Sequence, residues 1–170
     1  MAKQSIMTIA PRFNVIRMVA EYVRKFYAPA ALHGRRFASD EFAVARTVAE
    51  WKARVRGAWP GVRLHRLDTP ERRLAFGKSL EIQVAVQLNG LNPEDVTVEA
   101  LVGRPGPGGI SSQRARRYPL HTEGMTGNGE MLYTLNLTPE LCGKLEYGIR
   151  VFPSHPELIH KFEPGLMIWL

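Results

Sequence analysis

The stretch Leu80-Glu-Ile-Gln-Val-Ala-Val-Gln-Leu-Asn-Gly-Leu-Asn-Pro-Glu-Asp-Val-Thr-Val-Glu-Ala-Leu-Val102 decides the fold of this 170-residue chain. Apolar residues take every second position over residues 80–88 and again over 96–102, which is the period of a strand with one buried face. The intervening residues 89–93 are Asn, Gly, Leu, Asn and Pro, a composition typical of turns. The stretch therefore predicts two strands of an antiparallel structure.

The same alternation recurs toward the C-terminus, over residues 131–137, 145–151 and 166–170. Weaker strand patterns lie at 62–67 and 114–120, and we expect Gly/Pro-rich loops at 103–109 and 123–129. About seven short strands at this spacing predict an immunoglobulin-like antiparallel β-sandwich. Tyr147, shortly after the turn at residues 138–140, is placed like the corner tyrosine of such domains.

The first third of the chain has a helical period instead. Apolar residues recur at three- and four-residue steps, forming one stripe of a helix: Val15, Ile16, Met18, Val19, Tyr22, Val23, Phe26 and Tyr27. Asn14 is a suitable N-cap, and Pro29 is expected to end or kink the helix. We expect residues 34–36 to form a connector.

A second helix is expected to begin at Ser39 or Asp40 and to end near Gly57 and Pro60. Its apolar face consists of Val44, Val48, Trp51, Val55 and Trp59. The predicted fold class is thus α+β, with a helical connector at residues 1–59 and a β-sandwich domain at 60–170. Two such helices cannot bury both apolar stripes by themselves and need a third surface, either the following domain or something absent from this chain. We expect Arg17, Tyr22, Phe26 and Tyr27 to form a partner interface, and the isolated chain to self-associate through the first helix.

Composition limits the class of protein. An apolar content of 45% and a charged content of 23% are those of a soluble globular chain. No apolar run approaches the roughly 20 residues that span a bilayer, and residues 1–10 lack the apolar core of a secretory signal, so we expect no membrane contact and a cytoplasmic location. The single cysteine, Cys142, is expected to be a buried small hydrophobe in a turn at 141–143.

The net charge of +7 is unevenly distributed. Residues 1–66 contain 13 Lys/Arg and 4 Asp/Glu, whereas residues 67–170 contain 10 and 12. The basic residues of the first part alternate with apolar ones at helical spacing, which favours a solvated face, or a face that meets an acidic neighbour, over a nucleic-acid site. A nucleic-acid-binding protein is the second alternative, and its affinity would fall steeply with salt.

No catalytic, cofactor or metal site can be assigned from the residue pattern. The five histidines are scattered without a metal-ligand spacing, and no serine lies in a nucleophile elbow. The first alternative is a carbohydrate-binding module, because aromatic rings can stack on sugars. Tyr118 and Trp169 are the candidate α-glucan contacts, and retardation in a glucan-containing gel would support that role.

Segments at both ends of the chain contain motifs that can be compared with known families. At the N-terminal end these are Phe13-Asn14, Arg17-Met18-Val19, Glu21-Tyr22, Tyr27 and Pro29-Ala30. At the C-terminal end they are Tyr147-Gly-Ile-Arg-Val-Phe-Pro-Ser-His-Pro156 and Gly165-Leu166 with Trp169. Together they resemble the α-glucan (glycogen/maltodextrin) phosphorylases of the subfamily with a C-terminal extension, and they indicate the C-terminal segment of such an enzyme.

This resemblance implies a parent enzyme that uses pyridoxal phosphate and orthophosphate to shorten α-1,4-glucans, releasing glucose 1-phosphate. In the family a lysine in a Gly/Thr/Ser-Asn-Met-Lys context holds the cofactor. That context is absent around all six lysines: Lys3, Lys25, Lys52, Lys78, Lys144 and Lys161. We therefore expect no cofactor in this chain, no activity of the chain alone, and a structural or orienting role beside the catalytic lobes of the parent.

Overall fold

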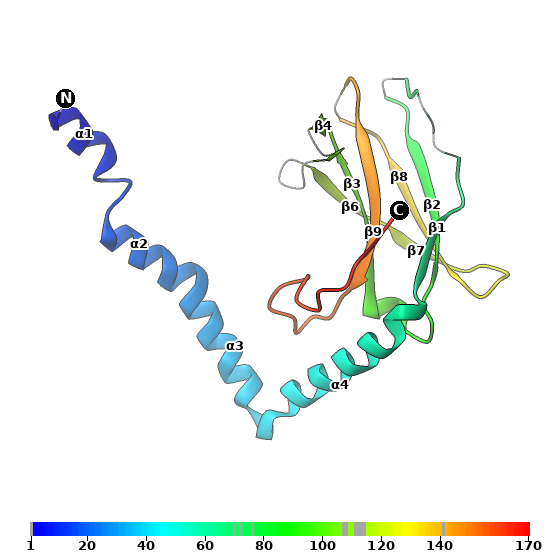
Figure 1. The fold of residues 1–170 in the computed structure, drawn as a ribbon, viewed down its shortest axis with the longest axis horizontal. Helices are drawn as coiled ribbons and strands as arrows, with labels where there is room; N and C mark the ends of the chain where they lie inside the picture. The colour runs from blue at the N-terminus through cyan, green and yellow to red at the C-terminus, as the bar shows by residue number, and fades with distance from the viewer. Residues whose placement is uncertain are drawn as a thin grey trace. The chain divides into compact units, whose positions relative to one another are not determined.

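A computed structural model describes residues 2–69, 71, 73–75, 77–106, 109–110, 115–140 and 142–170. The chain forms two compact units, residues 1–50 and residues 51–170. The class is α+β, as predicted: helices come first and antiparallel sheets follow (Figure 1). The predicted domain boundary between residues 59 and 60 stays a prediction. Residues 51–58, the last two turns of helix α4, fold with the sheets.

The helices begin with α1 (Ala2–Ile9), which the sequence pattern did not predict. The first predicted helix continues without a break through α2 (Val15–Tyr22), the π-helical stretch η1 (Val23–Tyr27) and α3 (Ala28–Ala38). Of the two outcomes predicted for Pro29, an end or a kink, the helix does not end there, but a π-helical irregularity does lie shortly before the proline. The prediction of a connector at residues 34–36 is wrong, because these residues are helical. Proline has no backbone N–H group, which is tolerated near the start of a helical segment. Here the π-helical stretch before α3 already replaces the α-helical hydrogen bonds at this point, so the missing N–H group does not end the helix.

The second predicted helix starts later than expected. Residues Asp40–Phe42 form a short turn, η2, in which all three have positive φ values of 48°, 52° and 64°. Left-handed backbone angles are costly for residues with a Cβ atom and do not belong to a right-handed helix. The turn therefore interrupts the helix, and α4 runs from Ala43 to Ala58. A 3₁₀ turn, η3 (Trp59–Gly61), then leads into the sheets.

Two antiparallel sheets of four strands each form the main body. The first contains, in spatial order, β1 (Arg63–Arg66), β2 (Leu80–Gln87), β8 (Met131–Leu137) and β7 (His121–Met125). The second contains β10 (Ile168–Trp169), β9 (Glu146–Pro153), β3 (Val96–Gly103) and β6 (Arg116–Pro119). A short turn, η4 (Pro93–Asp95), precedes β3, and a two-residue pair, β4 (Pro105–Gly106) with β5 (Gly109–Ile110), lies in the predicted Gly/Pro loop.

All seven predicted strands are present, with shifted ends in several. The structure adds β7, because residues 123–125 belong to that strand and not to a loop. Strand β7 is exposed along its whole length and carries a register shift between Thr122 and Gly124, so it has no alternating apolar signal. Arg114, at the predicted start of β6, and Leu141, in the predicted turn, lie outside the described residues, as do residues 107–108 of the loop.

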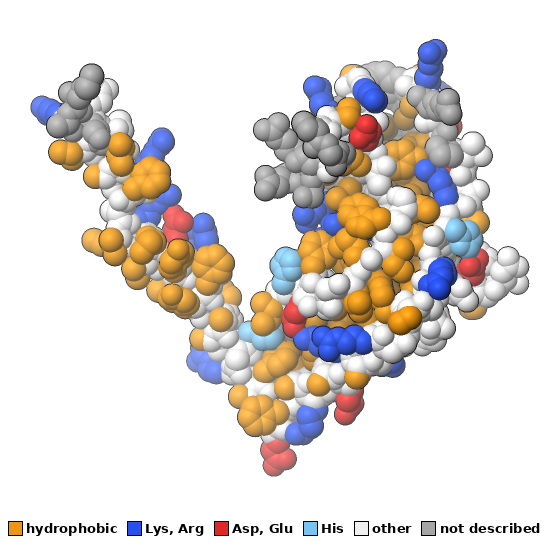
Figure 2. All heavy atoms as spheres, viewed as in Figure 1, with side chains coloured by type: hydrophobic (Ala, Val, Ile, Leu, Met, Phe, Trp, Pro, Cys, Tyr) orange, Lys and Arg blue, Asp and Glu red, His pale blue; other side chains and the backbone are white. Residues whose placement is uncertain are grey.

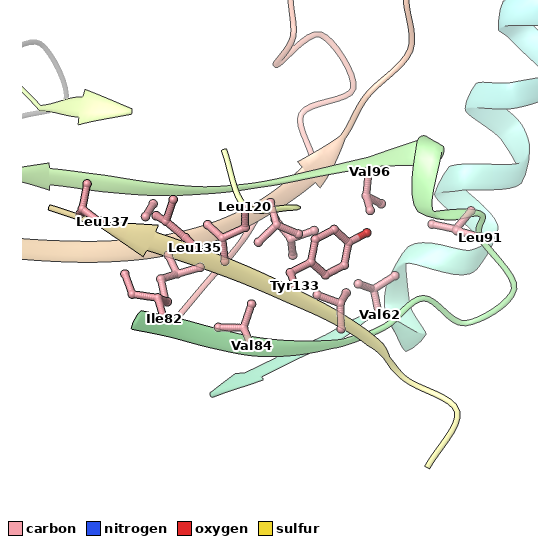
Figure 3. Packing of buried hydrophobic residues seen from close by; sticks show 14 of the residues in the cluster. Val62, Ile82, Val84, Leu91, Val96, Leu120, Tyr133, Leu135 and Leu137 are labelled. Carbon is pink, nitrogen blue, oxygen red and sulfur yellow. The ribbon is translucent and has the colours of Figure 1, made fainter. Parts of the chain in front are cut away.

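The core lies between the two sheets. Alternate residues of β2, β8, β3 and β9 form one buried apolar cluster, and Trp51, Val55 and Trp59 from the helical side join it, as their spacing predicted (Figure 3). One polar group lies within it: the hydroxyl of Tyr133 is buried, points toward Val96 and has no hydrogen-bond partner among the described residues. The Tyr147 hydroxyl accepts a hydrogen bond from the Arg66 side chain, and the corner-tyrosine expectation stays a prediction.

Candidate partner-binding surface

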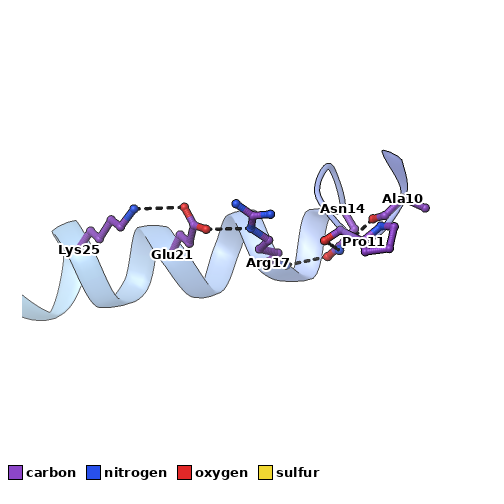
Figure 4. Close-up of polar contacts among 6 residues, drawn as sticks. All are labelled: Ala10, Pro11, Asn14, Arg17, Glu21 and Lys25. Atoms are coloured by element: carbon purple, nitrogen blue, oxygen red, sulfur yellow. Dashed lines mark hydrogen bonds and ion pairs between the residues drawn. The ribbon is translucent and has the colours of Figure 1, made fainter. Parts of the chain in front are cut away.

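Helix α2, the start of the first predicted helix, begins with a well-formed N-cap. The Asn14 side chain accepts a hydrogen bond from the Arg17 backbone N–H at 2.8 Å, while its amide nitrogen donates to the carbonyls of Ala10 and Pro11 (Figure 4). Asn14 has extended backbone angles, as an N-cap residue should. The cap predicted from the sequence is confirmed, and it fixes where the helix begins.

Two ion pairs that share Glu21 run along one side of this helix. Arg17 Nε donates to Glu21 Oε1 at 2.9 Å, and Lys25 Nζ lies 3.3 Å from Glu21 Oε2 (Figure 4). The hydrogen bond from Arg17, followed by that from Lys25, lowers the pKa of Glu21 below its ordinary value. Arg17, one of the predicted interface residues, therefore lies on the polar side of the helix and is paired along it.

The other side of the helix is apolar and uncovered. None of residues 15–38, all of them described, is buried. Tyr22 is 45% exposed, Phe26 59% and Tyr27 62%, and Figure 2 shows hydrophobic side chains gathered along this helical segment. Contiguous exposed apolar surface of this kind marks an interaction site. We call the stripe formed by Val15, Met18, Val19, Tyr22, Phe26 and Tyr27 the aromatic stripe.

Three rings of the aromatic stripe contact one another. The centroids of Tyr22 and Phe26 are 5.9 Å apart at an interplanar angle of 71°, and those of Tyr22 and Tyr27 are 6.4 Å apart at 67°. Both are edge-to-face arrangements, the favourable geometry for aromatic pairs. The structure thus brings together three of the four residues that the sequence proposed as an interface.

The two candidate sugar contacts are not brought together. Trp169 pairs with Arg150 in register and lies on the outer face of the second sheet, where it is 52% exposed. Tyr118 pairs with Ala100, a core residue, and packs against the core on the inner face. Because directly opposed residues point to the same side of a sheet, the two rings lie on opposite faces and cannot form one stacking platform.

Trp169 lies at the edge of a buried charged cluster. Arg150 donates to Glu99 through Nε at 2.8 Å and also through Nη2, and Lys161 Nζ donates to Glu99 Oε2 at 3.2 Å. The Arg150 guanidinium carbon lies 4.7 Å from the Phe162 ring centroid and 5.1 Å from that of Trp169. Lys161 and Phe162 belong to the segment after β9, so this cluster holds the C-terminal segment against the outer face of the sheet.

A cavity of about 260 Å³ opens where β8 ends and β9 begins. Its walls are largely apolar, and Glu71 and Lys78 are the charged residues among the described part of its lining. Cys142 also lines it and is exposed, so the prediction of a buried thiol is wrong. Cys142 lies in a connection beyond the end of β8, where no strand turns its side chain inward.

Within the described ranges, no three or more His, Cys, Asp and Glu side chains are grouped so that they could hold a metal ion. No helix in the described part of the chain combines the length and the apolar character that crossing a membrane requires.

Comparison with known proteins identifies the family. A model of the glycogen phosphorylase C-terminal domain matches residues 59–170. The chain belongs to this family. The glycogen phosphorylase of Mycobacterium tuberculosis (strain H37Rv) is 35% identical to it over 170 residues, which is 98% of this chain. The maltodextrin phosphorylase of Thermococcus litoralis is 37% identical over 171 residues, or 99% of the chain.

This member of the phosphorylase C-terminal domain family spans only 20% of the length of each of these relatives. The similarity extends beyond the domain model, because an alignment over 98% of the chain includes nearly all of the helical residues before residue 59. The aromatic stripe therefore lies in a segment that the longer enzymes share but that precedes their C-terminal domain.

Proposed function

We propose that this chain is a non-catalytic C-terminal part of an α-glucan phosphorylase, and that it binds and orients the rest of that enzyme through the aromatic stripe. The observation that carries the proposal is the stripe itself. A helix with no buried residue presents three contacting aromatic rings in a chain that matches one fifth of a much longer enzyme.

The length of the relatives supports the choice of partner. About four fifths of each of them lies outside the matched segment, so a large folded surface belonging to the same polypeptide is available to cover the stripe. Burying one large apolar side chain contributes about 1.5–3 kcal/mol, so covering Tyr22, Phe26 and Tyr27 would stabilise the contact substantially. The ion pairs of Arg17 and Lys25 with Glu21 satisfy the opposite side of the helix, which can stay in water.

The surroundings of the lysines support a non-catalytic role. A pyridoxal phosphate site needs a lysine in a pocket together with groups that bind the phosphate. Lys25 and Lys52 are paired with the partly exposed Glu21 and Glu163, Lys161 is paired with the buried Glu99, and Lys144 lies 4.0 Å from Glu146. Lys78 lines the 260 Å³ cavity, and the described residues that share this lining include no arginine and no second lysine. These residues do not fit the cofactor, which we assign to the remaining four fifths of the enzyme.

Two finer assignments belong to the same proposal. If β1, β2, β3, β6, β7, β8, β9 and β10 are named A, B, C, C′, D, E, F and G, the two sheets have the strand orders A-B-E-D and G-F-C-C′. These are the strand orders of immunoglobulin-like domains, and they support an immunoglobulin-like sandwich. The free, exposed thiol of Cys142 supports a reducing compartment such as the cytoplasm.

An activity assay tests the non-catalytic role. The isolated chain, incubated with a linear α-1,4-glucan, orthophosphate and pyridoxal phosphate, should release no glucose 1-phosphate. The maltodextrin phosphorylase of T. litoralis serves as the positive control under the same conditions. Turnover that copurifies with the isolated chain would overturn the proposal.

A further inference from the structure

The π-helical stretch η1 decides which residues share the aromatic stripe. In a regular α-helix a residue five positions further on lies about 140° around the axis, so Tyr27 would face away from Tyr22. Here the backbone N–H of Ala28 donates to the carbonyl of Val23, a five-residue span that defines the π turn. The wider turn places Phe26 and Tyr27 on either side of Tyr22, in edge-to-face contact with it.

The position of Pro29 accounts for the π turn at this point. In an α-helix the carbonyl of Lys25 would accept a hydrogen bond from the N–H of residue 29, and proline has none. The chain therefore lacks one α-helical hydrogen bond at this point, and the wider hydrogen-bonding pattern immediately precedes the proline. The proline is thus a local cause for the irregularity, in a segment of which no residue is buried.

We propose that the π turn builds a three-ring anchor from Tyr22, Phe26 and Tyr27, and that this anchor is the part of the stripe that the preceding region of the phosphorylase polypeptide grips. This inference rests on the proposed function. The anchor has apolar ring faces and two phenol hydroxyls without a described partner. The recess that receives it is therefore apolar, with hydrogen-bond acceptors for the hydroxyls of Tyr22 and Tyr27.

Side-chain footprinting with hydroxyl radicals tests the anchor. Reactivity is compared between the isolated chain, kept dilute, and the phosphorylase polypeptide that carries this chain as its C-terminal fifth. We expect Tyr22, Phe26 and Tyr27 to lose their reactivity in the longer polypeptide and to reach the level of buried Phe152. If Tyr22 and Phe26 lose reactivity while Tyr27 keeps it, the anchor is refuted and the proposed function stands. If all three rings stay reactive in the longer polypeptide, or are already unreactive in the dilute isolated chain, the anchor and the proposed function are both refuted.

Two one-residue deletions test the role of the π turn. Deleting Arg24 restores α-helical spacing and leaves Phe26 and Tyr27 three and four positions after Tyr22, still on one stripe, so all three rings should remain protected. Deleting Ala20 rotates Tyr22 about 100° relative to the helix before it, and Tyr22 should become reactive. If the rings lose protection equally in both variants, the proposal that the π turn brings Tyr27 onto the same stripe as Tyr22 is contradicted.

Discussion

The indole N–H of Trp51 donates to Oδ1 of Asp95 at 2.7 Å, joining helix α4 to the turn before β3 across 44 positions of sequence. Arg54 adds two contacts from the next turn of the helix, at 2.6 Å to Oδ2 and 3.0 Å to Oδ1. The backbone N–H of Asn92 supplies a fourth hydrogen bond to the same carboxylate, at 2.8 Å. One buried carboxylate thereby fixes the end of α4 to the two-sheet body.

Asp95→Asn should lower the free energy of unfolding by about 2 kcal/mol, because charge-assisted hydrogen bonds are replaced by neutral ones. Glu163→Gln, which weakens the more accessible pair with Lys52, is the matched control and should cost under about 1 kcal/mol. Denaturant unfolding measures both variants. Equal costs would show that Asp95 does not anchor α4.

The stability contributed by Asp95 should depend on pH. Burial raises the pKa of its carboxyl, but the hydrogen bonds from Arg54, Asn92 and Trp51 outweigh burial and hold the pKa below its ordinary value. Since the folded value is the lower one, this contribution is fully present above about pH 4 and is lost as pH falls through the folded value. Asp95→Asn should therefore show a smaller loss of stability in acid than the parent chain does.

Tyr133→Phe should stabilise the protein by about 1 kcal/mol, because it removes a buried hydroxyl that has no described partner. Burial raises the pKa of Tyr133 to about 12. Because the unfolded chain ionises near pH 10, the parent should lose stability between about pH 10 and 12, and the variant should lose less. Unfolding curves at neutral and alkaline pH measure both effects. A less stable variant would reveal a buried hydrogen-bond partner.

Glu99→Gln should cost about 3 kcal/mol, since it leaves the buried Arg150 guanidinium without its counter-charge. The C-terminal segment should also loosen, because Lys161 loses the same partner, and trypsin should then cleave after Lys161 more quickly. Glu146→Gln, whose partner Lys144 is exposed and 4.0 Å away, is the control and should change neither property. Unchanged cleavage in Glu99→Gln would contradict the account of this cluster.

The isolated chain should self-associate through the aromatic stripe, because the stripe is apolar and none of its described residues is buried. Sedimentation velocity should show a mass that rises with concentration. Replacing Tyr22 and Phe26 together by serine should give a monomer, whereas Arg24→Ser, on the polar side, should not. A strict monomer at all concentrations, unaffected by these changes, would count against an exposed stripe.

The strands that the sequence predicted well are those whose alternate residues enter the apolar core. β2, β3, β8 and β9 alternate because only one side of each meets the core, and this alternation is visible without a structure. β7 was missed because both of its faces are exposed. Cys142 was misplaced because burial in a loop depends on neighbours that no local pattern specifies.

The candidate surface was predicted only in part. Helical spacing suggested Tyr22, Phe26 and Tyr27, but α-helical geometry could not place Tyr27 beside Tyr22, because that contact needs the π turn. The cluster of Glu99 with Arg150 joins residues 51 positions apart, and its partners depend on strand register, which a single sequence does not encode locally. The break at Asp40–Phe42 was also unpredictable, since left-handed residues with a Cβ atom are rare.

Amide hydrogen exchange over residues 15–27 tests the central claim most directly. In the isolated chain, kept dilute so that it stays monomeric, these amides should exchange rapidly, because a helix with no buried residue opens easily. In the phosphorylase polypeptide that carries this chain as its C-terminal fifth, they should be protected to the level of the core strands β2 and β8. Equally rapid exchange in both proteins would show that the rest of the enzyme does not bind this helix, contradicting the proposed function.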